Sequence, residues 1–182
     1  MEKKYKLTEE TINVDGVTLY RIEALKDFGD IQKGDKGGFI EKEDNLSQEG
    51  DCWVYDAGKV YRKAYVHNDA RVYGRVMVYD NARICGNAMV YCNAEVYDNT
   101  IICGDALVYD YAEVYGNAVV YGNAEIYDNA RICGNALVYG NAKVFGYARI
   151  RGKAKIYGNA TVYGNARVCN NAVVCGDMKF YN

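Results

Sequence analysis

The 182-residue sequence contains no proline, and histidine and tryptophan occur once each, as His67 and Trp53. The absence of proline suits a chain made almost wholly of strands, because proline removes hydrogen-bond donors from a β-ladder. No apolar run approaches the 18 or more residues that a membrane helix needs, so no membrane partner is expected. The opening residues MEKKYKL lack an apolar stretch, and we therefore expect no signal peptide.

The seven cysteines are an odd number, and most of them replace a tyrosine within a repeat. They show neither the spacing of a disulfide framework nor a CxxC pair of the kind that zinc sites use. We therefore expect reduced thiols, a cytoplasmic protein, and neither a metal nor another cofactor.

From Val54 onward the chain repeats a six-residue unit, as in VYGNAEIYDNARICGNALVYGN. Twenty-one hexads run without insertion or deletion from Val54 to Lys179. The first position is Val or Ile in every hexad, and the fifth is Ala in most. The exceptions at the fifth position are Gly58, Val76, Thr100 and Met178.

A period of six does not match the 3.6-residue turn of an α-helix, but it matches a short strand followed by a corner. In the stretch A-x-V-Y, alternation places Ala and Val inside and x and Tyr outside. The next two residues, usually Gly-Asn, are predicted to form the corner because both tolerate left-handed backbone conformations. Three strands and three corners close a coil of 18 residues, so 21 hexads predict seven triangular coils.

This pattern resembles the hexapeptide repeat of left-handed parallel β-helices over residues 54–179. The resemblance implies an all-β fold, a left-handed parallel β-helix solenoid. The second position is usually Tyr, where that family more often has a small or acidic residue. The Tyr-Gly-Asn-Ala units, preceded by LYRIEALKDFGDIQKGDKGGFI, resemble phage and prophage repeat proteins, which would place the protein in the host cytoplasm.

Residues 1–53 do not follow the hexad and are predicted to cap the solenoid, whose open edge needs shielding. INVDGVTLYRIEAL predicts a hairpin around Asp15-Gly16. A Gly-rich segment with a short strand at residues 38–40 follows, and Trp53 is expected to pack where the cap meets the first coil. The predicted organisation is therefore a cap at 1–53, a solenoid at 54–179 and a short end at 180–182.

Sorting the outward residues in steps of 18 gives three faces. Face one, which begins at Lys59 and Tyr61, is acidic in the middle and basic toward the C-terminus; face three, which begins at Arg71 and Tyr73, has an aromatic residue in every coil. Face two has an apolar middle, which predicts self-association, and the resemblance implies a trimer, although a dimer also satisfies closed symmetry. The predicted interface consists of Ile101, Cys103, Val119, Tyr121, Leu137 and Tyr139.

Charge is distributed unevenly along the chain. From Arg131 onward there are eight basic residues and one acidic residue, against 14 basic and 23 acidic residues before it. Arginine forks bind phosphate, and nearby tyrosines offer stacking partners. The predicted site for a nucleotide-sized anion consists of Arg131, Arg149, Arg151, Lys153, Lys155, Arg167 and Tyr157. A solvated basic surface, or contact with the acidic half of another copy, remains open, whereas extended nucleic acid is not expected.

The hexapeptide-repeat resemblance also implies an acyltransferase with a catalytic histidine, for which His67 is the candidate general base. The repeat lacks the inserted loop that helps to build an acyl-donor pocket in that family. We therefore predict a non-enzymatic, homo-oligomeric binding protein, in its sharpest form a phage-type sponge that sequesters a nucleotide-like immune signal. The alternatives are an acyltransferase that uses His67 and a structural scaffold whose oppositely charged ends stack.

Overall fold

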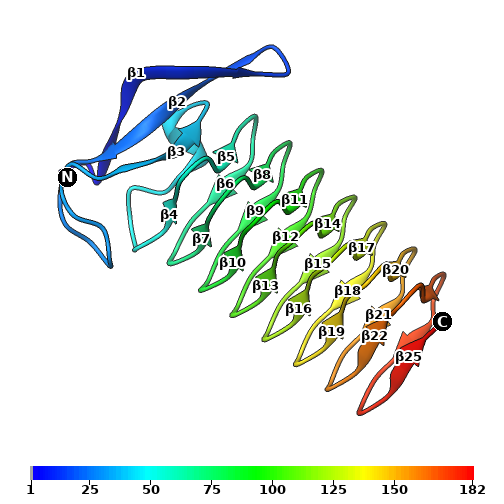
Figure 1. Ribbon diagram of the computed structural model, residues 1–182. Coiled ribbons are helices and arrows are strands. Elements are labelled where there is room, and N and C mark those ends of the chain that lie inside the picture. Colours follow the sequence, from blue (N-terminus) through cyan, green and yellow to red (C-terminus); the bar gives the residue numbers. More distant parts are fainter. Residues whose placement is uncertain (1) are drawn as a thin grey trace.

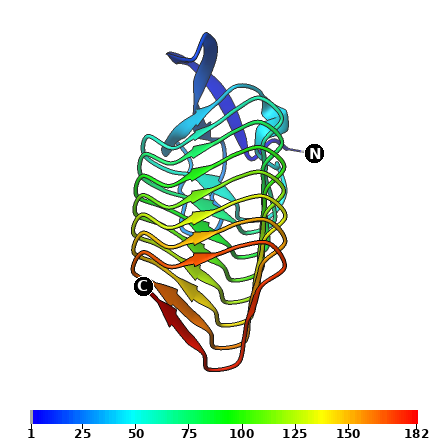
Figure 2. The same ribbon diagram turned by 90° about the vertical axis from the view of Figure 1, so that its right-hand side faces the viewer.

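The computed structural model describes residues 2–182 as a parallel β-solenoid with three sheets along its sides (Figure 1). Successive strands visit the three sheets in turn, so that each sheet gains one strand per coil (Figure 2). The helical content of the described residues is a single 3-10 turn, η1 (Glu43–Asn45). This architecture confirms the all-β solenoid predicted from the hexad.

The three sheets correspond to the three predicted faces. Face one contains β1 (Tyr5–Val14), β2 (Val17–Ala24), β3 (Lys36–Ile40), β5 (Lys59–Val60), β8 (Met77–Val78), β11 (Glu95–Val96), β14 (Glu113–Val114), β17 (Arg131–Ile132), β20 (Arg149–Ile150) and β23 (Arg167–Val168). Face two contains β6 (Tyr65–Val66), β9 (Arg83–Ile84), β12 (Ile101–Ile102), β15 (Val119–Val120), β18 (Leu137–Val138), β21 (Lys155–Ile156) and β24 (Val173–Val174). Face three contains β4 (Trp53–Val54), β7 (Arg71–Val72), β10 (Met89–Val90), β13 (Leu107–Val108), β16 (Glu125–Ile126), β19 (Lys143–Val144), β22 (Thr161–Tyr163) and β25 (Lys179–Tyr181).

Stacked coils are joined by backbone hydrogen bonds between residues 17 positions apart. The Ile101 amide donates to the Ala118 carbonyl at 3.0 Å, and the same step recurs along the solenoid. Register is maintained throughout, with Val96 paired to Val114 and Ile102 to Val120. The aliphatic and alanine positions are therefore buried in vertical columns, and each fully buried Val contributes roughly 1.5–3 kcal/mol.

The corners correct one part of the sequence interpretation. Only the residue at the third position of a hexad adopts a positive φ, as at Gly104 (72°) and Asp98 (59°). The fourth position, usually Asn, does not, so its backbone preference is not what selects it. On the corner between faces two and three its side chain forms an amide ladder instead, in which Asn123, Asn141 and Asn159 each donate to the side chain 18 residues on at 2.9–3.1 Å.

Aspartate at the third position has a separate role. The carboxylates of Asp98 and Asp128 accept the amide hydrogens of Gly116 and Gly146, 18 residues further on, at 2.9 and 3.0 Å. A carboxylate at such a corner thus satisfies a backbone donor in the next coil. This explains why Asp and Gly share the third position.

The N-terminal segment caps the solenoid and also lengthens it. β1 and β2 form the predicted hairpin, with Asp15 and Gly16 at φ 51° and 81° in its turn. β2 pairs antiparallel with β3, and β3 pairs parallel with β5, so β3 joins hairpin and solenoid in one sheet. β3, the Leu46–Val66 bridge and β4 form one more turn, which ends at the first hexad residue, Val54, so the solenoid has about eight turns rather than seven.

Trp53 lies where the prediction placed it. Its ring is 1% exposed and meets Tyr5 and Phe28 edge-on, with centroid separations of 6.1 and 5.4 Å. An aromatic cluster therefore closes the N-terminal end of the aliphatic core, while the hairpin extends beyond the side of the coils (Figure 1).

The corner glycines give a direct test of coil stacking. In Gly104→Ala, the new Cβ would lie 2.9 Å from the Gly122 amide nitrogen in a residue held at φ 72°. Gly16→Ala is the matched control, since its φ is 81° but nothing lies within 4 Å of the new Cβ. Strained backbone conformations cost about 1–3 kcal/mol, so both variants should melt below wild type, and Gly104→Ala lowest. Equal midpoints by circular dichroism would contradict the close approach of the coils.

Candidate functional site

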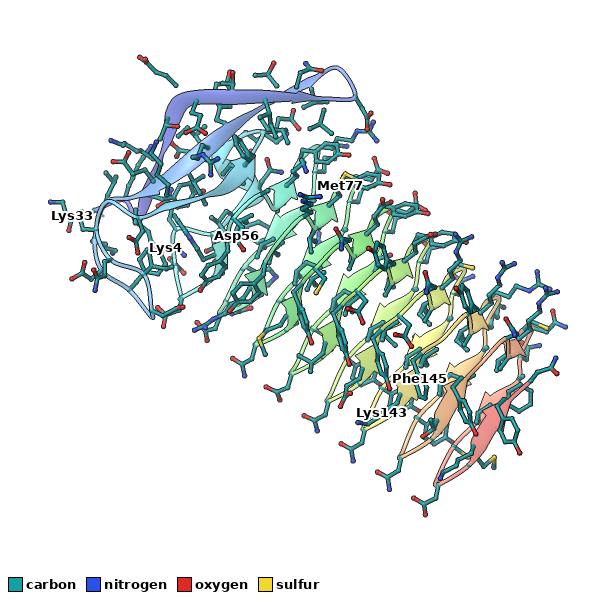
Figure 3. All side chains as sticks on the ribbon, viewed as in Figure 1. Lys4, Lys33, Asp56, Met77, Lys143 and Phe145 are labelled. Atoms are coloured by element: carbon teal, nitrogen blue, oxygen red, sulfur yellow. The ribbon has the colours of Figure 1, made fainter. Side chains whose placement is uncertain are left out.

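The outward positions form the columns that the sequence predicted. On face three, Tyr91, Tyr109, Tyr127, Phe145, Tyr163 and Tyr181 form one continuous stack, with ring centroids 4.7–5.3 Å apart. Shorter stacks join Tyr61 to Tyr115 on face one and Tyr121 to Tyr157 on face two. The rings project from the strands in rows, with Phe145 labelled in Figure 3.

Charge along face one changes sign at a single ion pair. Glu113 lies 2.8 Å from Arg131. Glu95 pairs with Glu113 in the ladder, and burial, with the Glu113 carboxylate next, raises the pKa of Glu95 above its usual value. Beyond Arg131 come Arg149 and Arg167, each directly opposite its neighbour in the parallel ladder. The acidic and basic halves therefore meet within this column.

The predicted anion site is brought together around one corner of the solenoid. Arg149 and Arg151 lie on face one, Lys153 at the following corner and Lys155 at the start of face two, and all four side chains are exposed. Arg167 follows Arg149 one coil later. Within residues 2–182 none of these five side chains forms an ion pair, whereas Arg131 is paired to Glu113. We call these five residues the basic cluster.

Tyr157 lies on face two, two residues after Lys155 of the basic cluster. One side of its ring stacks on Tyr139 at 4.9 Å, and hydrogen bonding to Cys175 raises its pKa. Tyr139 thus covers one side of the ring, and Cys175 follows Tyr157 one coil later on the other side.

The predicted interface on face two forms one column in register. Ile101 pairs with Val119, and Val119 with Leu137, while Arg83 precedes the column and Lys155 follows it. These three aliphatic side chains point outward and are half-buried by one another, and Tyr121 beside them is 37% exposed. The apolar strip is thus present and is bounded by a cation at either end.

His67 lies near the cap, far along the axis from the basic cluster. Its ring stacks on Tyr65 at 4.8 Å, and burial lowers its pKa below 6.5, with Arg83 acting in the same direction. It borders a polar cavity of about 310 Å³ together with Ser47, Glu49, Gly50, Tyr65, Asn68 and Asp69. A neutral imidazole in a small polar cavity is compatible with a general base, and the cavity lies where the cap meets the first coil.

Sequence reasoning missed Lys4, which is 1% exposed. Its ammonium donates to the carbonyls of Gly50 and Cys52 at 3.1 and 3.0 Å and lies over the Phe28 ring at 4.9 Å. Lys4 is labelled in Figure 3. Burial lowers its pKa. Nothing in the hexad pattern signals this residue, because its partners are loop carbonyls of the cap.

Parts of the solenoid match a known repeat family. Residues 70–83, 82–98, 130–146, 154–170 and 162–176 match the YdcK Beta solenoid repeat. A curated relative, the "Uncharacterized acetyltransferase YdcK" of Escherichia coli (strain K12), is 41% identical over 66 residues. Over these stretches the chain is therefore similar to known beta-solenoid repeats. The matched stretch spans 32% of this chain and 20% of that relative.

Two further features of the described residues bear on the site. Among residues 2–182 no group of three or more His, Cys, Asp or Glu side chains is placed to hold a metal ion. In the same part of the chain, no helix has the length and apolar character needed to span a membrane.

The single histidine makes its environment directly measurable. We expect the His67 imidazole to titrate below pH 6.5, because burial disfavours its charged form. The unfolded chain then binds this proton more readily, so His67 lowers the free energy of unfolding as pH falls below about 6.5. NMR titration of the imidazole C–H signals gives the midpoint.

Arg83→Gln should raise that midpoint toward 6.5, while Arg149→Gln, at the other end of the solenoid, should leave it unchanged. A wild-type midpoint at or above 6.5 would contradict the lowering of the His67 pKa by burial.

Proposed function

We propose that this protein is a non-enzymatic, self-associating binding protein whose basic cluster holds a small phosphate-bearing ligand. The observation that carries the proposal is the pairing of Arg149 directly opposite Arg167, with no acidic partner for either among residues 2–182. Like charges directly opposite in a β-ladder are destabilising, and a bound anion removes that repulsion. Arg151, Lys153 and Lys155 extend the same positive surface around the corner.

Phosphate suits this arrangement because guanidinium forks donate two parallel hydrogen bonds to its oxygens. The cluster is short, spanning two coils on face one, so a nucleotide-sized anion fits it better than a long polyanion. The finer form of the proposal is sequestration, in which a nucleotide-like signal is bound and released unchanged, as the resemblance to phage proteins suggests.

Self-association is the second part of the proposal. Ile101, Val119 and Leu137 present an apolar strip on a flat, rigid face, and such strips on soluble proteins mark interaction surfaces. The basic cluster reaches face two at Lys155, directly below Leu137. An interface along face two would therefore place the clusters of neighbouring copies close to the same edge.

An acyltransferase remains the alternative. The name of the YdcK relative favours it, and so does the lowered pKa of His67 at the edge of a polar cavity. The uninterrupted hexads from Val54 to Lys179 disfavour it, because no inserted loop is present to build a donor pocket. Acetyl transfer from acetyl-CoA that disappears in His67→Ala would establish this alternative in place of the binding role.

The anion site is tested by calorimetric titration with ADP at low and moderate salt. Arg149→Ala combined with Arg151→Ala should weaken binding at least about 10-fold, since each charge-assisted hydrogen bond contributes roughly 1.5–3 kcal/mol. Lys143→Ala is the matched control, because the Lys143 ammonium is already paired to Glu125 at 2.9 Å. ADP should be recovered unhydrolysed.

Absence of ADP binding, or equal binding in the double variant and Lys143→Ala, would contradict the site. A double variant that melts higher than wild type in the absence of ADP would be the expected sign of relieved repulsion.

Self-association is tested by light scattering. Wild type should have a mass that is a multiple of the 20.4 kDa chain, three-fold for the trimer. Leu137→Glu should give single chains, because a carboxylate is costly to desolvate at the centre of an apolar strip. Thr161→Glu, at the equivalent outward position of face three, should leave the mass unchanged. A wild-type mass of one chain would rule out the interface.

A further inference from the structure

The aromatic stack of face three has almost no free ring faces. From Tyr91 to Tyr181 successive rings lie 4.7–5.3 Å apart, and most of the interplanar angles are 11° or less. Each ring in the middle of the stack is covered on both sides by its neighbours, so only ring edges and hydroxyl groups face the solvent. A flat ligand can therefore stack on this column only where the column is interrupted or where it ends, at Tyr181.

The column is interrupted once, between Tyr73 and Tyr91. These two residues are neighbours in the column, yet their rings do not stack on each other. Tyr73 stacks on Tyr55 instead, at 4.2 Å and 17°. The break therefore separates a two-ring stack near the cap from the six-ring stack below it.

The cap accounts for the break. Asp30 accepts a hydrogen bond from the Tyr55 hydroxyl at 2.8 Å and lies 3.5 Å from the Arg71 guanidinium. Arg71 in turn donates to the Tyr73 hydroxyl at 3.4 Å. One carboxylate of the cap thus ties Tyr55, and through Arg71 also Tyr73, to the N-terminal end, away from Tyr91.

A cavity of about 540 Å³ lies at this break. Tyr73 and Tyr91 border it, and the outward side chains of Met89 and Leu107 give it an apolar surface. Gly74, Cys92 and Asp56 complete its lining at the corner between faces three and one, where Asp56 is labelled in Figure 3. The volume is within the usual range of small-molecule sites, about 300–1,000 Å³.

We propose that this cavity binds a small planar aromatic compound, uncharged or cationic, that stacks on the ring of Tyr91 or Tyr73. Met89 and Leu107 supply apolar contact for a ring of this kind. Asp56 selects against anions because its carboxylate is negatively charged. One of its oxygens accepts the Gly74 amide hydrogen at 3.2 Å, and the other remains able to accept a hydrogen bond from the ligand. This site lies on another face from the basic cluster and does not depend on the proposed function.

The test is saturation-transfer NMR on the full chain with three planar probes, indole, adenosine and nicotinamide, and with cyclohexanol as a non-planar control. At least one planar probe should show saturable transfer, and cyclohexanol should not. Met89→Arg should weaken binding at least about 10-fold, because a guanidinium would occupy the cavity. Thr161→Arg is the matched control, since residue 161 is the equivalent position four coils further along face three.

Two further variants separate binding from folding. Tyr91→Val removes one of the two rings that border the cavity and should weaken binding, while circular dichroism shows an intact solenoid. Asp30→Ala releases Tyr55 and Arg71, so that Tyr73 can approach Tyr91, and it should also weaken binding. Binding of no planar probe, or equal binding in Met89→Arg and Thr161→Arg, would overturn the proposal.

Discussion

The structure depends on one constraint, which is that every coil hydrogen-bonds to the coil above and below in the same register. The amide of residue i donates to the carbonyl of residue i+17 along strands and corners alike, as with Ile101 to Ala118 and Asn87 to Gly104. A residue therefore lies over its counterpart 18 positions away, so that side chains of one kind gather in a column. Aliphatic columns form a core, aromatic columns form stacks, and charged columns concentrate repulsion.

This constraint explains how much the sequence could predict. The hexad and the 18-residue step were sufficient to assign each outward residue to its face, and the observed pairing of Glu95 with Glu113 and of Ile101 with Val119 follows that assignment. The corner chemistry was only half predicted. A preference for Gly and Asn indicates a turn, but it does not distinguish a residue chosen for its backbone angle from one chosen for its amide ladder. Asn123 and Asn141 belong to the second kind, which becomes evident only when their side chains are seen in line.

The parts that could not be predicted lie where the period ends. Lys4, Asp30 and the turn built by β3, Leu46 and β4 depend on contacts between segments with no common repeat. The register of such contacts is set by loop lengths and by packing on Trp53, neither of which a local pattern encodes. For the same reason the break in the aromatic stack was not foreseen. By spacing alone Tyr73 is equivalent to Tyr91, and only Arg71 and Asp30 make it different.

A stacked solenoid also determines where function can reside. Within a uniform column each side chain is in contact with its neighbours on both sides, as the tyrosine rings of face three are. Little surface of such a side chain remains available to a ligand. Charged groups without a partner, and cavities, remain only where a column is not uniform. The change of sign on face one leaves Arg149 facing Arg167 rather than an acid, and the tie to Asp30 leaves a cavity between Tyr73 and Tyr91. Because side chains at the regular positions of this fold already contact one another, the irregular positions are the appropriate ones to probe for binding.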